Sequence, residues 1–303
     1  MAEDKLGFVA VQLSRKMWQG NNKLEGEEIG LDLSKLTPEV KEIVTLGHKK
    51  MYPKEWRDTF TGIYMKAYHY LQSNSLPFIS DHIRAVPKAK LAEVAAKLEG
   101  FQKEYLEAKE AFKANYEFIK NKWEAKYRGP MWDSMAGFYP RLEELDKKFD
   151  LYWNIFEVTS ATYSATSVAE VQVAYRRAKE ELNRRLGEMV EESITYLRAK
   201  AKETVANLRN RLVEGRIIRN DTIEAVRNVE QWFSELNIFG DAEIESQLKG
   251  LREALRGVDS KDLKEDASLN ATIINLADNV IKSASELEDI NTLTNTYRRT
   301  LEL

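Results

Sequence analysis

The chain has 303 residues, with 46 Lys and Arg against 49 Asp and Glu, so its formal net charge is −3. This balance excludes the overall positive field of a basic nucleic-acid-binding domain, and the absence of Cys excludes disulfides and thiolate metal sites. The apolar fraction of 43% is sufficient for a folded core, and the charged fraction of 31% is typical of long, solvated helices.

The first half of the sequence alternates between helix-like and strand-like segments. A short helix is predicted from Thr37 to Val44, because Thr and the following Pro suit the N-cap and the first helical position. Pro53 is expected to open a second helix, whose apolar face fades at Ser73. Three segments have the composition of strands: 8–18, 76–86 and 149–158. These segments predict a small α/β head with a short sheet over residues 1–160.

A long apolar stripe runs through this head from Leu91 to Trp123. Its members recur every three or four residues with Lys and Glu between them, which is the pattern of one helix face. Pro87 precedes the stripe and Gly129-Pro130 follows it, so one helix is predicted over residues 88–127. Because strand-like segments flank this helix, we expect part of its stripe to lie in the core of the head.

The second half of the sequence has the pattern of long helices. Residues 168–215 read as a single helix, which would approach about 70 Å in length at about 1.5 Å per residue. So long a helix must pack against other long helices or project from the molecule. Further helical segments follow at 220–236, 240–257 and 269–303. The prediction is a mainly α fold, with a coiled-coil-like bundle of long helices over residues 161–303.

No local motif in the sequence predicts a reaction. His48, His69 and His82 fall in three separate segments without metal-ligand spacing, and no phosphate-binding loop, dinucleotide motif or nucleophile elbow occurs. The paired glutamates alternate with Lys and Arg, as on a solvated helix face. We therefore expect no catalytic, cofactor-binding or metal-ligating residues, and no cofactor.

Two features of the second half are candidates for binding. The apolar seam of the helix at 168–215 is predicted to be the surface offered to a partner, and its residues are Tyr175, Leu182, Leu186, Met189, Leu197, Val205, Leu208 and Leu212. The densest basic cluster on the same helix includes Arg176, Arg177, Arg184 and Arg185, and a second cluster spans residues 209–219. A solvated helix face is favoured over a nucleic-acid patch, because Glu residues interleave with the first cluster.

Several short motifs occur in a characteristic order along the first half of the chain. They are Gly20-Asn21-Asn22-Lys23-Leu24, Gly30-Leu31-Asp32-Leu33, Leu46-Gly47-His48-Lys49-Lys50, LPFISDHIRAVP at 76–87 and FDLYWNIFEV at 149–158. Over roughly residues 6–160 this order resembles an uncharacterised domain-of-unknown-function family of bacterial and phage proteins. Members are often encoded beside a CobS/MoxR-like AAA+ ATPase. The resemblance implies a helical, non-enzymatic component that works with an ATPase, and it supplies no active-site residues.

The leading functional expectation is a non-enzymatic interaction or scaffold protein, an adaptor of a MoxR-type AAA+ ATPase. It would form homo- or hetero-oligomers in the cytoplasm, or in the host cytoplasm if phage-encoded. The alternatives are a phage or bacterial structural assembly protein, an α-helical pore-forming protein and a nucleic-acid-binding protein. No signal peptide and no membrane span is predicted, since no apolar run approaches about 18 residues.

Overall fold

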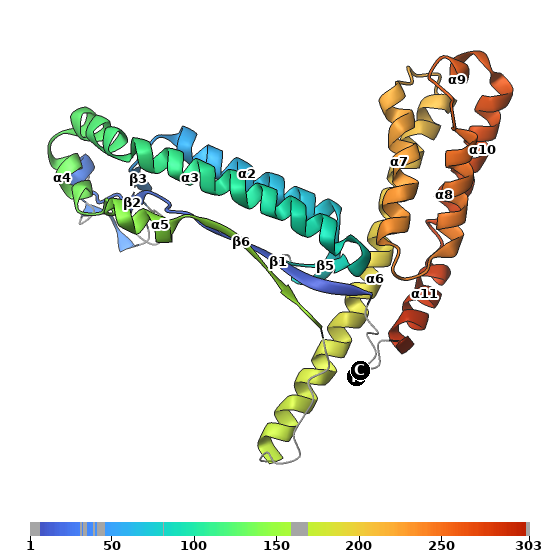
Figure 1. Cartoon of the computed structure of the whole chain (residues 1–303), viewed down its shortest axis with the longest axis horizontal. Coiled ribbons are helices and arrows are strands. Elements are labelled where there is room, and N and C mark those ends of the chain that lie inside the picture. The colour runs from blue at the N-terminus through green and yellow to red at the C-terminus, as the bar shows by residue number, and fades with distance from the viewer. Residues whose placement is uncertain are drawn as a thin grey trace. The chain divides into compact units, whose positions relative to one another are not determined.

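The computed structural model describes residues 7–30, 32, 35–38, 40, 46–80, 82–158 and 169–300. Most of the helix predicted from Thr37 to Val44 lies outside these described residues, as does the linker predicted at 159–167. Figure 1 shows long helices together with a small sheet. The prediction of a mainly α fold with a short sheet is therefore confirmed.

The strands are short and the helices include two very long ones. The strands are β1 (Phe8–Lys16), β2 (Asn21–Lys23), β3 (His48–Lys50), β4 (Leu76–Ser80), β5 (Ile83–Pro87) and β6 (Asp150–Phe156). The helices of the first half are α2 (Lys54–Ser73), α3 (Leu91–Tyr127), α4 (Pro130–Ala136) and α5 (Leu145–Lys148), with single 3₁₀ turns η1 (Glu27–Ile29), η3 (Lys88–Lys90) and η4 (Leu142–Glu144). Those of the second half are α6 (Ala169–Val213), α7 (Asn220–Leu236), α8 (Ala242–Ala254), α9 (Asp262–Glu265), α10 (Ala267–Ser283) and α11 (Leu287–Thr300).

The main sheet has the order β4-β5-β1-β6. β1 pairs antiparallel with β5, placing Phe8 opposite Pro87, and β5 pairs antiparallel with β4. The segment predicted as one extended stretch at 76–86 is thus a hairpin of two strands, in which Ser80 pairs with Ile83. A second, two-stranded sheet joins β2 to β3. Its strands carry Asn, Lys and His, residues without strand composition, and were not predicted.

The chain forms two compact units, which we call unit 1 and unit 2. Unit 1 comprises Met1–Gln12, Gln72–Val94 and Ile155–Leu303, and unit 2 comprises Leu13–Leu71 and Ala95–Asn154. This division differs from the predicted one at residue 160. The β4–β5 hairpin belongs with the later helices, because its apolar side chains share their core.

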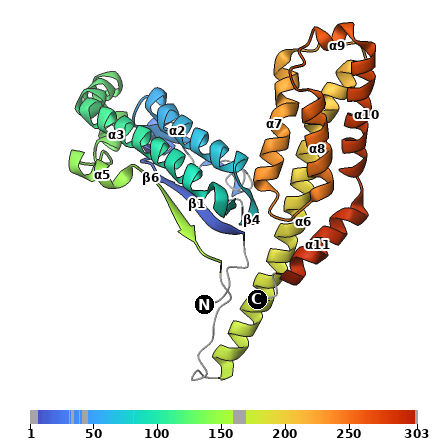
Figure 2. The same cartoon turned by 45° about the vertical axis from the view of Figure 1, so that its right-hand side comes forward.

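Unit 1 is a bundle around the second half of α6. α7 and α10 pack beside α6, and α8 packs against α7 and α10 on the far side of the bundle (Figures 1 and 2). Each helix turns an apolar stripe inward, as α7 does with Ile223, Val226, Val229, Phe233 and Leu236 at helical spacing. Phe8 and Phe78 of the sheet join the same core, with their ring centroids 5.5 Å apart.

Unit 2 has an aromatic core. The stripe on α3 lies in this core, with Tyr105, Phe112 and Tyr116 buried, which confirms the expectation for part of that helix. The other aromatic rings of the core come from several elements: Trp18, Tyr52, Trp56, Phe60, Trp132, Tyr139 and Phe149. Burial raises the pKa of Tyr52 to about 12 and raises the pKa of Tyr105, Tyr116 and Tyr139 further.

The hydroxyls of these buried tyrosines are all paired with backbone carbonyls. Tyr105 donates to Lys16 O at 2.8 Å, and Tyr52 donates to Trp18 O at 2.7 Å. Tyr139 likewise donates to Met51 O at 2.6 Å. Tyr116 donates to Pro140 O at 2.7 Å. A buried hydroxyl needs such a partner, and three of the four acceptors lie at the end of β1 or directly after β1 and β3. The aromatic core therefore also fixes the path of the chain at the end of β1.

Candidate interaction surface

The apolar seam on α6 is internal core. Leu186, Met189, Leu197, Val205, Leu208 and Leu212 are buried against other elements of unit 1, and Leu182 is partly buried against the same core. The side chain of Tyr175 lies outside the described residues. The structure therefore corrects the assignment of this seam to a partner. A long amphipathic helix has the same pattern whether another protein or its own chain covers it.

Two arginines of the basic cluster near the start of α6, Arg184 and Arg185, are paired with glutamates of the same helix. Arg184 and Arg185 both lie 2.7 Å from Glu181, and Arg184 also pairs with Glu188. These contacts hold the pKa of Glu181 at about 2, below its usual range. Arg176 and Arg177 are exposed. The interleaved glutamates thus form the local ion pairs expected of a solvated helix face.

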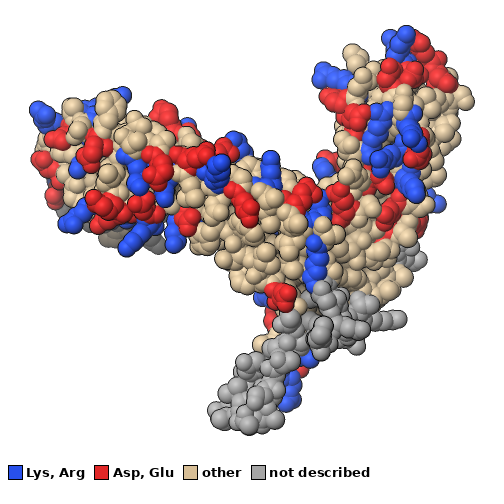
Figure 3. Space-filling view, in the orientation of Figure 1, with Lys and Arg blue, Asp and Glu red and all other residues tan. Residues whose placement is uncertain are grey.

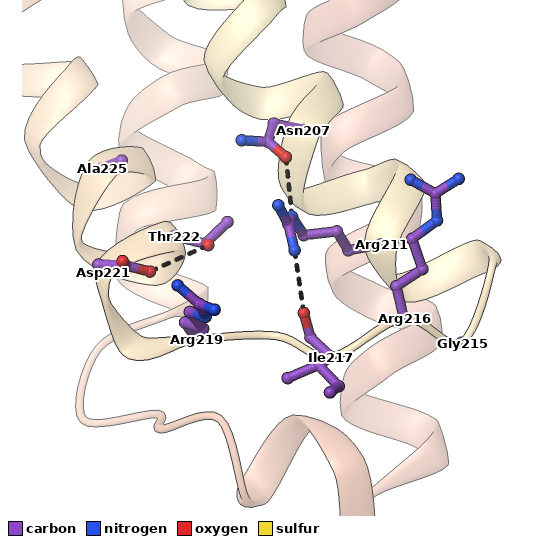
Figure 4. Close-up of a pocket in the computed structure, with 9 residues that line it drawn as sticks. All are labelled: Asn207, Arg211, Gly215, Arg216, Ile217, Arg219, Asp221, Thr222 and Ala225. Carbon is purple, nitrogen blue, oxygen red and sulfur yellow. Dashed lines mark hydrogen bonds between the residues drawn. The ribbon is translucent and has the colours of Figure 1, made fainter.

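The second basic cluster surrounds the turn between α6 and α7. A hollow of about 800 Å³ opens there, and Figure 4 shows its lining. The lining residues are Asn207, Arg211, Gly215, Arg216, Ile217, Arg219, Asp221, Thr222 and Ala225. Three arginines and a single carboxylate therefore face this hollow, whereas Arg209 is directed to Asp278 at 2.8 Å.

The turn is held in shape by one of these arginines. Arg211 donates from Nε to Asn207 Oδ1 at 2.9 Å and from Nη1 to the carbonyl of Ile217 at 3.1 Å (Figure 4). Gly215 has a φ of 63°, in the left-handed region that glycine adopts without strain, and ends α6. Arg216 pairs with Glu214 at 2.5 Å. These contacts hold the backbone of the turn between α6 and α7 in one conformation.

The same turn exposes apolar side chains. Ile217 is 81% exposed and Val213 is 53% exposed, so two aliphatic side chains beside the arginines are open to solvent. Such a combination of apolar contact area and guanidinium groups is enriched at protein–protein interfaces. Sequence analysis marked the basic residues here but missed the exposed Ile217. The available signal was an Ile-Ile pair between Arg216 and Arg219, directly after the helix-ending Gly215.

The described residues show neither a metal-binding cluster nor a membrane-spanning helix. No group of three or more His, Cys, Asp or Glu side chains in this part of the chain is arranged to hold a metal ion. Among the same residues, no helix is both long and apolar enough to cross a membrane.

Comparison with known proteins identifies a family. No curated protein and no solved structure matched this chain. One family model did match, described as a protein of unknown function (DUF3150), and the match extends over residues 6–280. It therefore covers both compact units and nearly the whole chain, well beyond the first half in which the sequence motifs were noted. The chain belongs to the DUF3150 family of proteins of unknown function.

Proposed function

We propose that this chain is a non-enzymatic helical interaction protein that binds a MoxR-type AAA+ ATPase through the turn between α6 and α7. The observation that carries the proposal is the 81% exposure of Ile217 on a turn fixed by Arg211. Transferring such a side chain fully from water into an interface contributes about 1.5–3 kcal/mol. Because the turn is already ordered, binding there costs little further conformational entropy.

The charges around Ile217 define the kind of partner surface that fits. Three arginines line the hollow, and Arg216 is already paired with Glu214. Arg211 and Arg219 remain against the carboxylate of Asp221, so a partner with Asp or Glu beside an apolar pocket is complementary. Arginine forms two parallel hydrogen bonds with a carboxylate, which gives such a contact directional specificity. Arg219 is the best placed for this role, since it forms no ion pair with any described residue.

The ATPase as partner rests on the gene neighbourhood that the motif resemblance implies. The proposal includes a bacterial or phage setting, a cytoplasmic location and assembly into an oligomer with the ATPase. The second half of α6 is buried, whereas its described side chains at residues 176–178 are exposed and so are available to a partner.

The proposal is tested by co-purification of the chain with the AAA+ ATPase encoded beside it. The variants Ile217→Asp and Arg219→Glu alter exposed side chains and are expected to fold normally, with unchanged thermal midpoints. Each is expected to weaken binding at least about tenfold, since each introduces an unpaired or repelling charge into the interface. Ile29→Asp is the matched control, because Ile29 is also exposed but belongs to unit 2.

Two results would contradict the proposal. The first is the absence of an AAA+ ATPase gene beside the gene for this chain, or no complex between the two proteins. The second is a complex that both turn variants form as tightly as the unaltered chain, which would move the interface away from this turn.

A further inference from the structure

The last helix of unit 1, α11, is held against the bundle by few side chains. Among its described side chains, only Ile290 and Thr294 are buried, and Leu293 and Tyr297 are partly buried against the core. The neighbouring helix α7, by contrast, buries five apolar side chains along its length. The apolar contact that holds α11 is therefore small for a helix of the bundle.

No ion pair strengthens this contact within the described part of α11. Its described side chains, at residues 290–297, include no charged residue. Figure 3 shows Lys and Arg gathered over α7 and α8, where Arg227 pairs with Glu224 and Arg252 pairs with Glu230. Charge pairing therefore fastens α7 and α8 to their surroundings but adds nothing to the docking of residues 290–297.

A polar side chain interrupts the inward stripe of α11. Thr294 is 3% exposed, and its Oγ1 makes no hydrogen bond to any described residue. A threonine in a helix can donate to the carbonyl four residues earlier, as Thr296 does to Thr292 O at 2.8 Å. A buried hydroxyl without an acceptor weakens the packing of the helix that carries it. The docking of α11 is therefore weaker than an aliphatic residue at position 294 would make it.

A short and well-anchored connection joins α11 to α10. α10 ends at Ser283 and α11 begins at Leu287, so three residues connect the two helices. The buried guanidinium of Arg198 donates from Nη1 to the carbonyl of Ser283 at 2.8 Å, and the carbonyl of Glu286 lies 3.5 Å from the same nitrogen. This anchor keeps α10 and the connection on the bundle, so α11 can move away without them.

The surface beneath α11 is apolar and lies along the middle of α6. α11 is beside α6 in both Figures 1 and 2. Ile290 shares a buried core with Leu186 and Met189 of α6, and the ring of Tyr297 meets that of Phe239 edge-on, with centroids 4.9 Å apart. Displacement of α11 would uncover this elongated apolar face, which has the character of a groove that binds an amphipathic helix.

We propose that α11 is a displaceable cover of this face, and that an amphipathic helix of a partner protein takes its place. The stripe of the partner helix follows from the one it replaces. It has apolar residues at the positions of Ile290, Leu293 and Tyr297, and an aliphatic residue at the position of Thr294. Such a helix gains the apolar contact that α11 lacks, which offsets the advantage that α11 has from its covalent attachment.

Two observations place this device apart from what is described above. The match to the family model ends at residue 280, before α11 begins, so the part of the chain that the model describes does not include the cover. The covered face lies along the middle of α6, whereas the interface proposed above lies at the turn after its carboxyl end. The inference therefore does not depend on that interface.

Hydrogen exchange of the full chain, followed by mass spectrometry, measures the opening of α11. We expect the amides of α11 to exchange at least about tenfold faster than those of α7 and α10, because α11 opens without unfolding of the bundle. Thr294→Val removes the buried hydroxyl and keeps the shape of the side chain, so it is expected to slow the exchange of α11 about tenfold. Thr296→Val is the matched control on the exposed face of the same helix, and it is expected to leave this exchange rate nearly unchanged.

A fluorescent peptide of residues 287–300 that carries Thr294→Val is the probe for the uncovered face. We expect it to bind the full-length variant Ile290→Asp, in which a buried charge displaces α11. It should bind the full-length Thr294→Val variant at least about tenfold more weakly, because the cover is then held more firmly. Leu293→Asp is a second opening variant, at a partly buried position. The same peptide with Ile290→Asp is the control, and it is expected not to bind.

Three results would overturn the proposal. The first is exchange of α11 as slow as that of α10, because α11 would then open only when the bundle unfolds. The second is a peptide that binds the two opening variants no more tightly than the Thr294→Val chain, while exchange in α7 and α10 is unchanged. The third is loss of protection in α7 and α10 in both opening variants, which would make α11 an integral part of the bundle.

Discussion

At the scale of single residues, Arg198 is the most consequential buried side chain. It is 1% exposed, and its guanidinium donates to the carboxylate of Asp241 at 2.7 and 3.2 Å. It also donates to the carbonyl of Ser283 at 2.8 Å. Asp241 in turn accepts a hydrogen bond from the backbone of Ile244 as the N-cap of α8. One arginine on α6 thus ties the start of α8 and the end of α10 to the bundle.

We expect Arg198→Met to lower the free energy of unfolding of unit 1 by about 3–5 kcal/mol, because it leaves Asp241 buried without its cation. Urea unfolding followed by circular dichroism measures the loss. Arg209→Met is the control on the same helix, and it should cost no more than about 1 kcal/mol since its pair with Asp278 is partly exposed.

The double variant Arg198→Met/Asp241→Asn separates charge from packing. It removes both charges and keeps an oxygen that can cap α8, so it should be more stable than Arg198→Met alone. A double variant less stable than Arg198→Met would mean that the buried charge of Asp241 is not what makes the single substitution costly.

At the scale of elements, one ion pair fastens the β2–β3 pair and η1 to α4. Lys49 on β3 lies 2.6 Å from Glu28 on η1 and donates to Ser134 Oγ of α4 at 3.1 Å. The hydrogen bond from Lys49 is the largest cause that lowers the pKa of Glu28, to about 2, and bonds from Ser134 and the backbone of Glu25 add to it. The side chains of both partners are mostly covered, so solvent screens this pair little.

We expect this pair to make the stability of unit 2 depend on pH. The folded pKa of Glu28 lies below its unfolded value, so the stabilisation is complete above about pH 4.5 and is lost as the pH falls towards 2. Glu28→Gln should therefore be less stable than the unaltered chain at pH 7, and the difference should shrink between those two pH values. Thermal melts over this pH range measure the difference in stability, and Glu27→Gln, a substitution at the exposed neighbouring residue, is the control. A difference that stays constant with pH would disprove the assignment.

Elements with a strong local pattern were predictable from the sequence, whereas those held by distant contacts were not. α7 begins at Asn220 and ends at Leu236, which matches the predicted segment 220–236, and β1 lies within the predicted segment 8–18. β2 and β3 escaped prediction because their stability comes from pairing and from the Lys49–Glu28 contact rather than from residue type. Residues 76–87 were predicted as one extended segment, because no glycine between β4 and β5 indicates the turn of a hairpin.

The candidate surface was only partly predictable for a related reason. Periodicity identifies the apolar seam of α6 but does not show what covers it, and the covering helices are the chain's own. The basic residues around the α6–α7 turn stand in the sequence as scattered charges. The fold brings Arg211, Arg216 and Arg219 to one hollow.

At the scale of the whole molecule, the two units are interleaved along the chain. Unit 1 comprises the first half of β1, the β4–β5 hairpin and the helices after residue 155. The hairpin is integral to it, because Leu76 and Phe78 lie in the same buried core as α6 and α7. Two polar contacts reinforce this packing. Trp232 donates to the carbonyl of Ser73 at 2.9 Å, and Lys90 pairs with Glu235 at 2.5 Å.

A cut at residue 160, where composition suggests a boundary, should therefore damage unit 1. We expect the free energy of unfolding of fragment 161–303 to be at least about 3 kcal/mol lower than that of unit 1 in the intact chain. It loses the side chains of Phe8, Leu76 and Phe78, and burial of each contributes about 1.5–3 kcal/mol. The fragment should also bind a hydrophobic dye at the uncovered face of α6, which the intact chain should not.

Adding the fragment 1–160 in trans distinguishes a missing core from a poorly folding fragment. If the hairpin and β1 complete the core of unit 1, the added fragment should suppress dye binding and raise the urea midpoint of 161–303. A substitution of Phe78→Asp in the added fragment should abolish that recovery, because it places a charge at a buried position. Were 161–303 alone to unfold at the same urea concentration as in the intact chain, the later helices would be an independent domain, and the core that they share with the hairpin would contribute nothing to their stability.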